Sequence, residues 1–200
     1  CGRVTGRFRV RTTDSNHAQP IAPNRLAELP APTAADQIWL GDITYIPTAE
    51  GWLYLAGLKD LFTCEIVGHA MGERMTQELV GQALLRAVQA KRPPRELIHH
   101  SDRGSQYCAH EYRQMLEQFG MRASMSRKGN CYDNAPMESL WGSLKTELVH
   151  HRRYATRSEA EASIREYLEI FYNRQRRHSR LGYVAPAVFA QNFGKLPAAA

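Results

Sequence analysis

The chain has 200 residues, of which 26 are Lys or Arg and 20 are Asp or Glu, so its formal charge is +6 at neutral pH. With 43% hydrophobic and 23% charged residues, the composition is that of a globular protein and excludes disordered, collagen-like and low-complexity classes. The longest apolar run, Leu53–Leu58, is far shorter than the roughly 20 residues of a membrane span. The N-terminal segment lacks the apolar core of a secretory signal, so a cytoplasmic protein without a membrane partner is expected.

The basic excess is a mild indication of a polyanionic partner. No Cys-x-x-Cys pair occurs, which favours isolated reduced thiols over disulfides or a zinc site. The four cysteines are Cys1, Cys64, Cys108 and Cys131.

Residues 1–36 are rich in Arg, Pro and small polar residues and are predicted to form a basic, mostly irregular leader. Because the chain begins at Cys1 rather than Met, it is expected to be a fragment of a longer protein. Three runs rich in β-branched and aromatic residues then predict a meander of strands. The runs are Ile38–Ile46, Leu53–Leu58 and Leu61–Ala70.

Helical and strand patterns alternate after the meander. Helices are predicted over Met75–Ala90, over Glu111–Phe119, from about Pro136, and from the capping box at Thr156 and Glu159. Further strands are predicted over Glu96–His100 and Met121–Met125, with a loop over Ser126–Asn130. The order βββαβαβαα predicts one α/β domain over residues 37–173, a mixed five-stranded sheet with helices on both faces. A basic C-terminal tail, residues 174–200, follows.

Three carboxylates lie where the core pattern does not explain them. Asp42 shares a face of the first strand with Leu40 and Ile46, Asp102 follows the fourth strand, and Glu138 lies in the first turn of a helix. Taken singly, they could be a salt-bridge partner, a turn residue and a favourable acid at a helix N-terminus. On separate elements of one small sheet, however, they can converge only at one edge.

Like charges that converge require cations between them. Oxygen-only ligands favour Mg²⁺ or Mn²⁺ over zinc. Two such ions about 4 Å apart suit in-line phosphoryl displacement.

Five motifs follow one another along the chain, and the first three contain these acids. They are Trp39-x-x-Asp42-Ile43-Thr44-Tyr45, His100-Ser101-Asp102-x-Gly104-x-Gln106-Tyr107, Asp133-Asn134-Ala135-x-x-Glu138-Ser139, Leu144-Lys145-x-Glu147 and Tyr172-Asn173-x-x-Arg176-x-His178-x-x-Leu181-Gly182-Tyr183-x-x-Pro186. With 35 residues between Asp102 and Glu138, the chain resembles the DDE transposases. The specific resemblance is to the retroviral-integrase-like core of OrfB-type bacterial insertion-sequence transposases.

The resemblance implies a ribonuclease H-like fold and metal binding by Asp42, Asp102 and Glu138. It implies an enzyme that nicks a transposon end with water and then joins a 3′-hydroxyl to a target phosphodiester, without a covalent protein–DNA intermediate. It also implies DNA as partner, a homo-oligomer assembled on DNA, and a helix-turn-helix region upstream of residues 12–17. The chain departs from the family pattern at Gly41, at Cys64-Glu65 and at Trp141-Gly142.

Several basic residues are candidate DNA contacts, although each could be a solvated surface charge. They are Lys145, Arg127, Lys128, Arg174, Arg176, Arg177 and Arg180. At 100° per residue, Glu138 and Lys145 lie on one shoulder of the apolar helix stripe and Glu147 on the other. Asn134 is expected to cap this helix.

Asp60 and Asp133 are interpreted as non-catalytic, and the sequence neighbours His100 and Ser101 are not interpreted as a hydrolase pair, because adjacency is not triad geometry. Two alternatives to the transposase remain open. One is a catalytically silent DNA-binding or assembly module, and the other is a general metal-dependent nuclease of the same fold. Strand-transfer activity would separate them, since the first neither cuts nor joins and the second cuts without joining.

Overall fold

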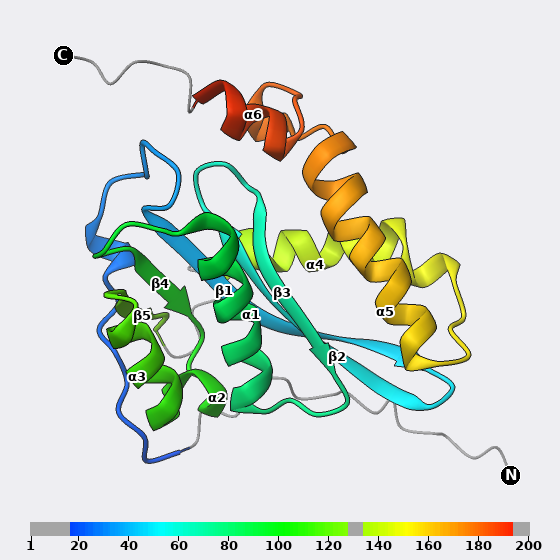
Figure 1. Ribbon diagram of the computed structural model, residues 1–200, viewed down its shortest axis with the longest axis horizontal. Coiled ribbons are helices and arrows are strands. Elements are labelled where there is room, and N and C mark those ends of the chain that lie inside the picture. The colour runs from blue at the N-terminus through cyan, green and yellow to red at the C-terminus, as the bar shows by residue number, and fades with distance from the viewer. Residues whose placement is uncertain (1–16, 128–133, 194–200) are drawn as a thin grey trace, which may run out of the picture.

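The computed structural model describes residues 17–127 and 134–193. Its centre is a five-stranded sheet with the order β3-β2-β1-β4-β5 (Figure 1). The first three strands form an antiparallel meander, whereas β4 is parallel to β1 and β5 is parallel to β4. The strands are β1 (Ile38–Thr48), β2 (Gly51–Asp60), β3 (Ile66–Gly72), β4 (Ile98–Ser101) and β5 (Arg122–Met125). The predicted mixed sheet is confirmed.

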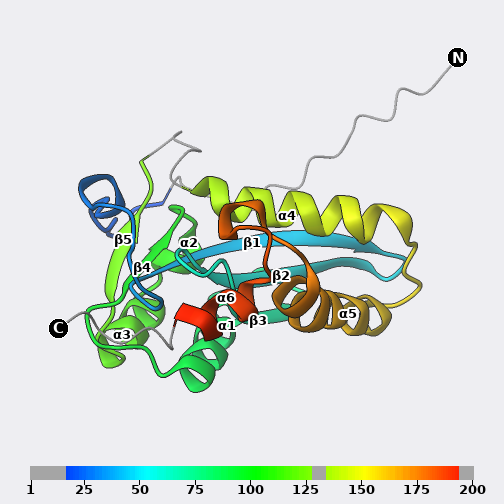
Figure 2. The same cartoon turned by 90° about the horizontal axis from the view of Figure 1, so that it is seen from above.

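Helices cover both faces of this sheet, as predicted. Figure 2 shows α4 on one side of the strands and α1 with α3 on the other. The helices are α1 (Gln77–Lys91), α2 (Ser105–Cys108), α3 (His110–Gln118), α4 (Ala135–Glu147), α5 (Arg157–Glu166) and α6 (Pro186–Phe193), with a π-helix η4 (Tyr167–Gln175) directly after α5. Short 3-10 turns lie at Leu26–Glu28, Val149–His151 and Ser179–Leu181. No helix in the described ranges is both long enough and apolar enough to cross a lipid bilayer.

Two hydrophobic cores lie on opposite faces of the sheet. Alternation along β1 directs Trp39 into the core beneath α1 and α3 and Leu40 into the core beneath α4 and α5. Both side chains are fully buried. Asp42 is two residues beyond Leu40, so the period of the strand places its side chain on the α4 face.

The third strand begins later than predicted. The sequence pattern placed its start at Leu61, but β3 starts at Ile66. The cause is Asp60, whose Oδ1 accepts hydrogen bonds from the backbone N–H of Phe62 and from both the N–H and the hydroxyl of Thr63. These bonds form a turn that ends with Cys64 at a positive φ of 61°. Asp60 is therefore a turn-forming carboxylate.

The segments before and after the sheet contact it directly. The N–H of Arg25 donates to Ser124 Oγ at 3.0 Å, which attaches the described part of the leader to β5. The side-chain amide of Asn173 exchanges two 2.9 Å hydrogen bonds with the N–H and C=O of Ile66 at the edge of β3. The sequence pattern did not predict α6, whose Phe189 and Phe193 pack on Phe62.

Replacing Gly68 or Gly142 by Ala is expected to change stability in opposite directions. A Cβ at Gly68 would lie 2.5 Å from the Ala83 carbonyl oxygen and 2.6 Å from Ala87 Cβ, so Gly68→Ala must separate α1 from β3 and should cost at least about 2 kcal/mol. A Cβ at Gly142 meets nothing within 4 Å, so Gly142→Ala should add about 0.5–1 kcal/mol through helix propensity. Chemical denaturation measures both, and a stable Gly68→Ala variant would contradict the close α1–β3 packing.

Candidate active site

The end of β4 brings Asp102 towards Asp42. Leu40 pairs with His100 in the parallel β1–β4 ladder, and the same register continued by two residues carries Asp42 alongside Asp102. Gly104 then turns the chain, and its N–H donates to Asp102 Oδ1 at 2.9 Å. A Cβ at Gly104 would lie 3.0 Å from that oxygen, so glycine leaves room for the carboxylate.

Helix α4 packs on the face of the sheet to which the Asp42 side chain points and contacts Asp42 there. The ammonium of buried Lys59 donates a hydrogen bond to the Pro136 carbonyl at 3.1 Å. This bond holds the first turn of the helix, which contains Glu138, against β2. One turn further on, the Trp141 indole lies over Gly57, the residue that pairs with Asp42 across the β1–β2 ladder. The Trp141 N–H donates to Asp42 Oδ2 at 3.0 Å.

Asp102 and Glu138 both act electrostatically on Asp42. The pKa of Asp42 is raised to about 7, mainly by burial and further by the Asp102 and Glu138 carboxylates, whereas hydrogen bonds from the Ile43 backbone and Trp141 oppose the shift. The structure therefore brings the three carboxylates into one electrostatic neighbourhood. Glu138 itself is exposed.

The three acids are not arranged as ligands around a single metal position. Within residues 17–127 and 134–193, no group of three or more His, Cys, Asp or Glu side chains is arranged to hold a metal ion. Asp42 is the shared member of the cluster, since both other acids act on it.

Tyr107 is a further member of this neighbourhood, although the sequence analysis assigned it no role beyond its place in the Asp102 motif. It is buried, and its pKa is raised by burial and then by Asp42, Tyr112 and Asp102. Its ring packs edge-on against Tyr112. Its place in the chain, directly after the Asp102 turn, is the signal that could have indicated it.

The histidines beside Asp102 are structural. His99 Nε2 lies 2.9 Å from the Tyr112 hydroxyl, and burial lowers the His99 pKa to about 3. His100 Nδ1 lies 2.9 Å from Ser124 Oγ. The Ser101 hydroxyl donates to the Asp102 carbonyl at 3.0 Å rather than to a histidine. The contacts of Ser101 and His100 are therefore with other groups, the Asp102 carbonyl and the Ser124 hydroxyl.

Lys145 lies on the Asp42 side of α4. Its ammonium is 4.6 Å from the centre of the Tyr45 ring. Burial lowers the Lys145 pKa, and the nearby Asp42 carboxylate partly reverses that shift. Of the other candidates in the loop before α4, Arg127 is exposed and Lys128 lies outside the described residues.

Arg176 forms an intramolecular ion pair that the sequence did not indicate. Its guanidinium donates from Nε and Nη2 to the Glu147 carboxylate at 2.7–3.0 Å. Glu147 also accepts a 2.7 Å hydrogen bond from the Tyr167 hydroxyl. Both contacts lower the Glu147 pKa, the Arg176 hydrogen bond most. Arg174, Arg177 and Arg180 are exposed.

The expected cap at the start of α4 is wrong in its detail. Asn134 precedes the helix, but its side chain makes no capping hydrogen bond. Its Oδ1 is buried and has no described hydrogen-bond donor. Pro136 at the start of the helix needs no N–H partner, which removes part of the need for a cap.

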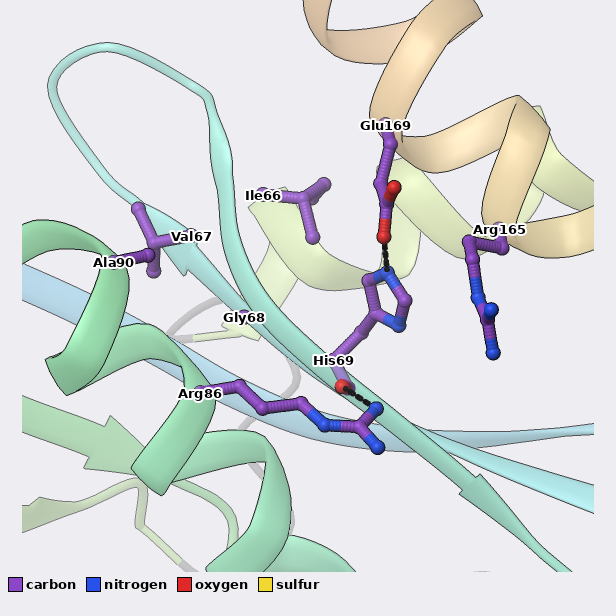
Figure 3. Close-up of a pocket in the computed structure, with 8 residues that line it drawn as sticks. All are labelled: Ile66, Val67, Gly68, His69, Arg86, Ala90, Arg165 and Glu169. Carbon is purple, nitrogen blue, oxygen red and sulfur yellow. Dashed lines mark hydrogen bonds and ion pairs between the residues drawn. The ribbon is translucent and has the colours of Figure 1, made fainter.

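A separate cavity of about 570 Å³ lies at the β3 edge, between α1 and the α5–η4 helices (Figure 3). His69 Nε2 is 3.1 Å from Glu169 Oε1, and Arg86 donates to the His69 carbonyl at 2.9 Å. The His69 pKa is lowered by burial and raised by Glu169. None of the three acids lines this cavity, so it is distinct from the carboxylate neighbourhood.

Comparison with protein families places most of the chain in one domain type. The integrase core domain family matches residues 32–131, and a second integrase core domain description matches residues 119–186.

Curated proteins of bacterial insertion elements are similar over most of the chain. It is 62% identical to an uncharacterized 31 kDa protein of insertion element IS600 from Shigella sonnei, covering 96% of this chain and 70% of that protein. It is 44% identical to the transposase for insertion sequence element IS904 from Lactococcus lactis, covering 92% and 72% respectively. It is 43% identical to the transposase InsF for IS3A from Escherichia coli, covering 86% and 60%.

Solved structures that share this fold include retroviral integrases. A chain of the simian T-cell lymphotropic virus intasome in complex with a PP2A regulatory subunit superposes with a TM-score of 0.69 at 16% identity, covering 95% of this chain and 65% of that one. The HTLV-2 integrase catalytic core domain in complex with magnesium superposes with a TM-score of 0.61 at 14% identity, covering 79% and 98%. The predicted ribonuclease H-like α/β fold is confirmed.

Proposed function

Because this chain belongs to the integrase-core family of insertion-sequence transposases and is the catalytic core that performs transposition, we propose that Asp42, Asp102 and Glu138 are its catalytic residues. In this proposal they hold Mg²⁺ or Mn²⁺ and carry out DNA strand cleavage followed by strand transfer. The substrates are a transposon end and a target duplex.

One observation carries the assignment of the acids. Asp42, on the central β1 strand, has its pKa raised towards 7 by burial and by the carboxylates of Asp102 and Glu138. Residues far apart in the chain therefore concentrate negative charge beside β1, where β4 ends, which is costly without a cation.

The donor set suits a hard divalent cation. All three side chains offer only oxygen, which favours Mg²⁺ or Mn²⁺. When bound, the ions would supply activation of the attacking oxygen and stabilisation of the leaving oxygen.

The protein's own residues would hold and orient the reacting groups. Asp42 and Asp102 are fixed by hydrogen bonds from Trp141 and from the Gly104 backbone, whereas exposed Glu138 can approach from α4. Lys145, on the same shoulder of α4, would bind a DNA phosphate next to the acids. Arg127, Lys128, Arg174, Arg177 and Arg180 would add backbone contacts, and Arg176 would hold α4 through Glu147 instead.

Strand transfer by the full-length protein tests this function. The protein, Mg²⁺ and oligonucleotides that carry the element's ends should give both nicked and joined products. Products that are nicked but never joined would instead identify a general nuclease. Binding without either product, with metal present, would identify a silent DNA-binding module.

Lys145→Ala is expected to weaken DNA binding. Loss of one phosphate contact should lower the slope of binding against salt by about one ion and affect all sequences alike. Fluorescence anisotropy across a salt series measures this slope. Arg176→Ala is the control, because its guanidinium is bound to Glu147; it should lower the melting temperature and leave the slope unchanged. An unchanged slope for Lys145→Ala would remove Lys145 from the DNA surface.

A further inference from the structure

Trp141 makes a directed contact with the acid cluster that its place in the core does not require. It is buried and belongs to the apolar stripe of α4, so the sequence pattern accounts for it as a packing residue. Its indole N–H nevertheless donates to Asp42 Oδ2 at 3.0 Å. A side chain that only filled space would not need a donor aimed at Asp42, a carboxylate whose pKa both other acids raise.

The sheet is shaped to receive this indole. Gly57 and Asp42 are direct partners across the β1–β2 ladder. A Cβ at Gly57 would lie 2.7 Å from Trp141 Cη2 and 3.2 Å from Cζ2. The six-membered ring therefore lies in the space that Gly57 leaves open. One strand pair supplies both the seat for the ring and the acceptor for the N–H.

We propose that Trp141 is a positioning residue for Asp42: seated over Gly57, its indole N–H fixes one carboxylate oxygen and so orients Asp42 for a divalent cation. This inference rests on the proposed function of the acid cluster. The indole has one N–H donor, and a hydrogen bond to a carboxylate is stronger and more directional than one between neutral groups. Partners that orient metal ligands typically affect affinity by about 10–100-fold.

Trp141→Phe removes the N–H and keeps an aromatic ring over Gly57. The affinity of the metal-free full-length protein for Mn²⁺ alone, read from the free-ion signal in electron paramagnetic resonance, should fall by about tenfold. The melting temperature without metal should change little, and the Mg²⁺ concentration that half-saturates strand transfer should rise. If the Phe variant melts early, β-(3-benzothienyl)alanine at position 141 repeats the test, since it keeps the fused rings and replaces N–H with sulfur.

Trp39→Phe is a matched control. The Trp39 indole also donates to a carboxylate at 3.0 Å, that of Asp36, but it lies in the core on the opposite face of the sheet. This variant should lose stability and keep the Mn²⁺ affinity of the wild type. A merely structural role for Trp141 would make the two variants behave alike.

Asp42→Asn separates failure of this inference from failure of the proposed function. Mn²⁺ binding that is lost in Asp42→Asn but unchanged in Trp141→Phe overturns the role of Trp141 and leaves the metal site standing. Wild-type Mn²⁺ binding in Asp42→Asn overturns the metal site, and the role of Trp141 with it. Loss in Asp42→Asn with a tenfold weakening in Trp141→Phe supports both.

Discussion

Glu138→Gln is expected to reduce strand transfer at least about 10³-fold, equivalent to roughly 4 kcal/mol of activation free energy. Glu138 is the acid on α4 whose charge acts on Asp42, and a neutral amide there would weaken both cation binding and transition-state charge stabilisation. The change is nearly isosteric and the side chain is exposed, so folding should be unaffected. Rates of joining with pre-nicked ends measure the effect on the second chemical step.

Glu147→Gln is the matched control on the same helix. Glu147 is half a helical turn out of phase with Glu138, and its carboxylate is bonded to Arg176 and Tyr167. Strand transfer should stay within about tenfold of wild type, while the melting temperature falls because the ion pair is lost. An inactive Glu147→Gln together with an active Glu138→Gln would mean that the helix phase and the proposed acids are both wrong.

Asp42→Asn is expected to abolish cleavage and joining yet stabilise the metal-free protein at pH 8. The pKa of Asp42 is about 7 in the folded protein against 3.8 for an unperturbed Asp, so between these values the folded state binds more protons than the unfolded state. The free energy of unfolding therefore falls as the pH rises through this window, and the cost is fully present above it. The shift is equivalent to about 4 kcal/mol, which solvent screening reduces to a gain of about 2 kcal/mol for Asn.

Denaturation of the metal-free proteins at pH 4 and pH 8 measures this effect. The gain should become small near pH 4, where Asp42 is protonated in the folded state and close to half protonated in the unfolded state. Asp60→Asn is the control of opposite sign: both Asp60 oxygens accept N–H bonds, so the amide places a donor against a donor and should cost about 1–3 kcal/mol. A loss of more than about 2 kcal/mol in Asp42→Asn would indicate a structural ion pair instead.

Most strands and helices could be predicted because their hydrophobic residues repeat with the period of a strand or of a helix. The structure agrees with the alternation along β1 and with the apolar stripe of α4, in which Met137, Leu140 and Leu144 are all buried. The start of β3 could not be read in this way, since the apolar residues Leu61 and Phe62 continue the strand pattern while Asp60 turns the backbone. The short α6 was missed because its aromatic residues find their partner, Phe62, far away in the chain.

That Asp42 lies near two other acids could be predicted because a carboxylate in an apolar strand is conspicuous. Their supports could not, since each depends on a neighbour across the sheet. In the sequence Gly57 is an ordinary strand glycine, and only the folded structure shows the Trp141 ring over it. In the same way, Arg176 belongs to a basic run in the sequence, and only the structure shows its ion pair with Glu147.

The amide of Asn173 has a consequence for how copies of this protein can associate. β3 is an edge strand, and an open edge is a template on which a strand from another chain can add. By exchanging two hydrogen bonds with Ile66, Asn173 imitates the first rung of a sixth strand and occupies the start of that template. Addition of a strand from another chain is thereby blocked at the start of β3.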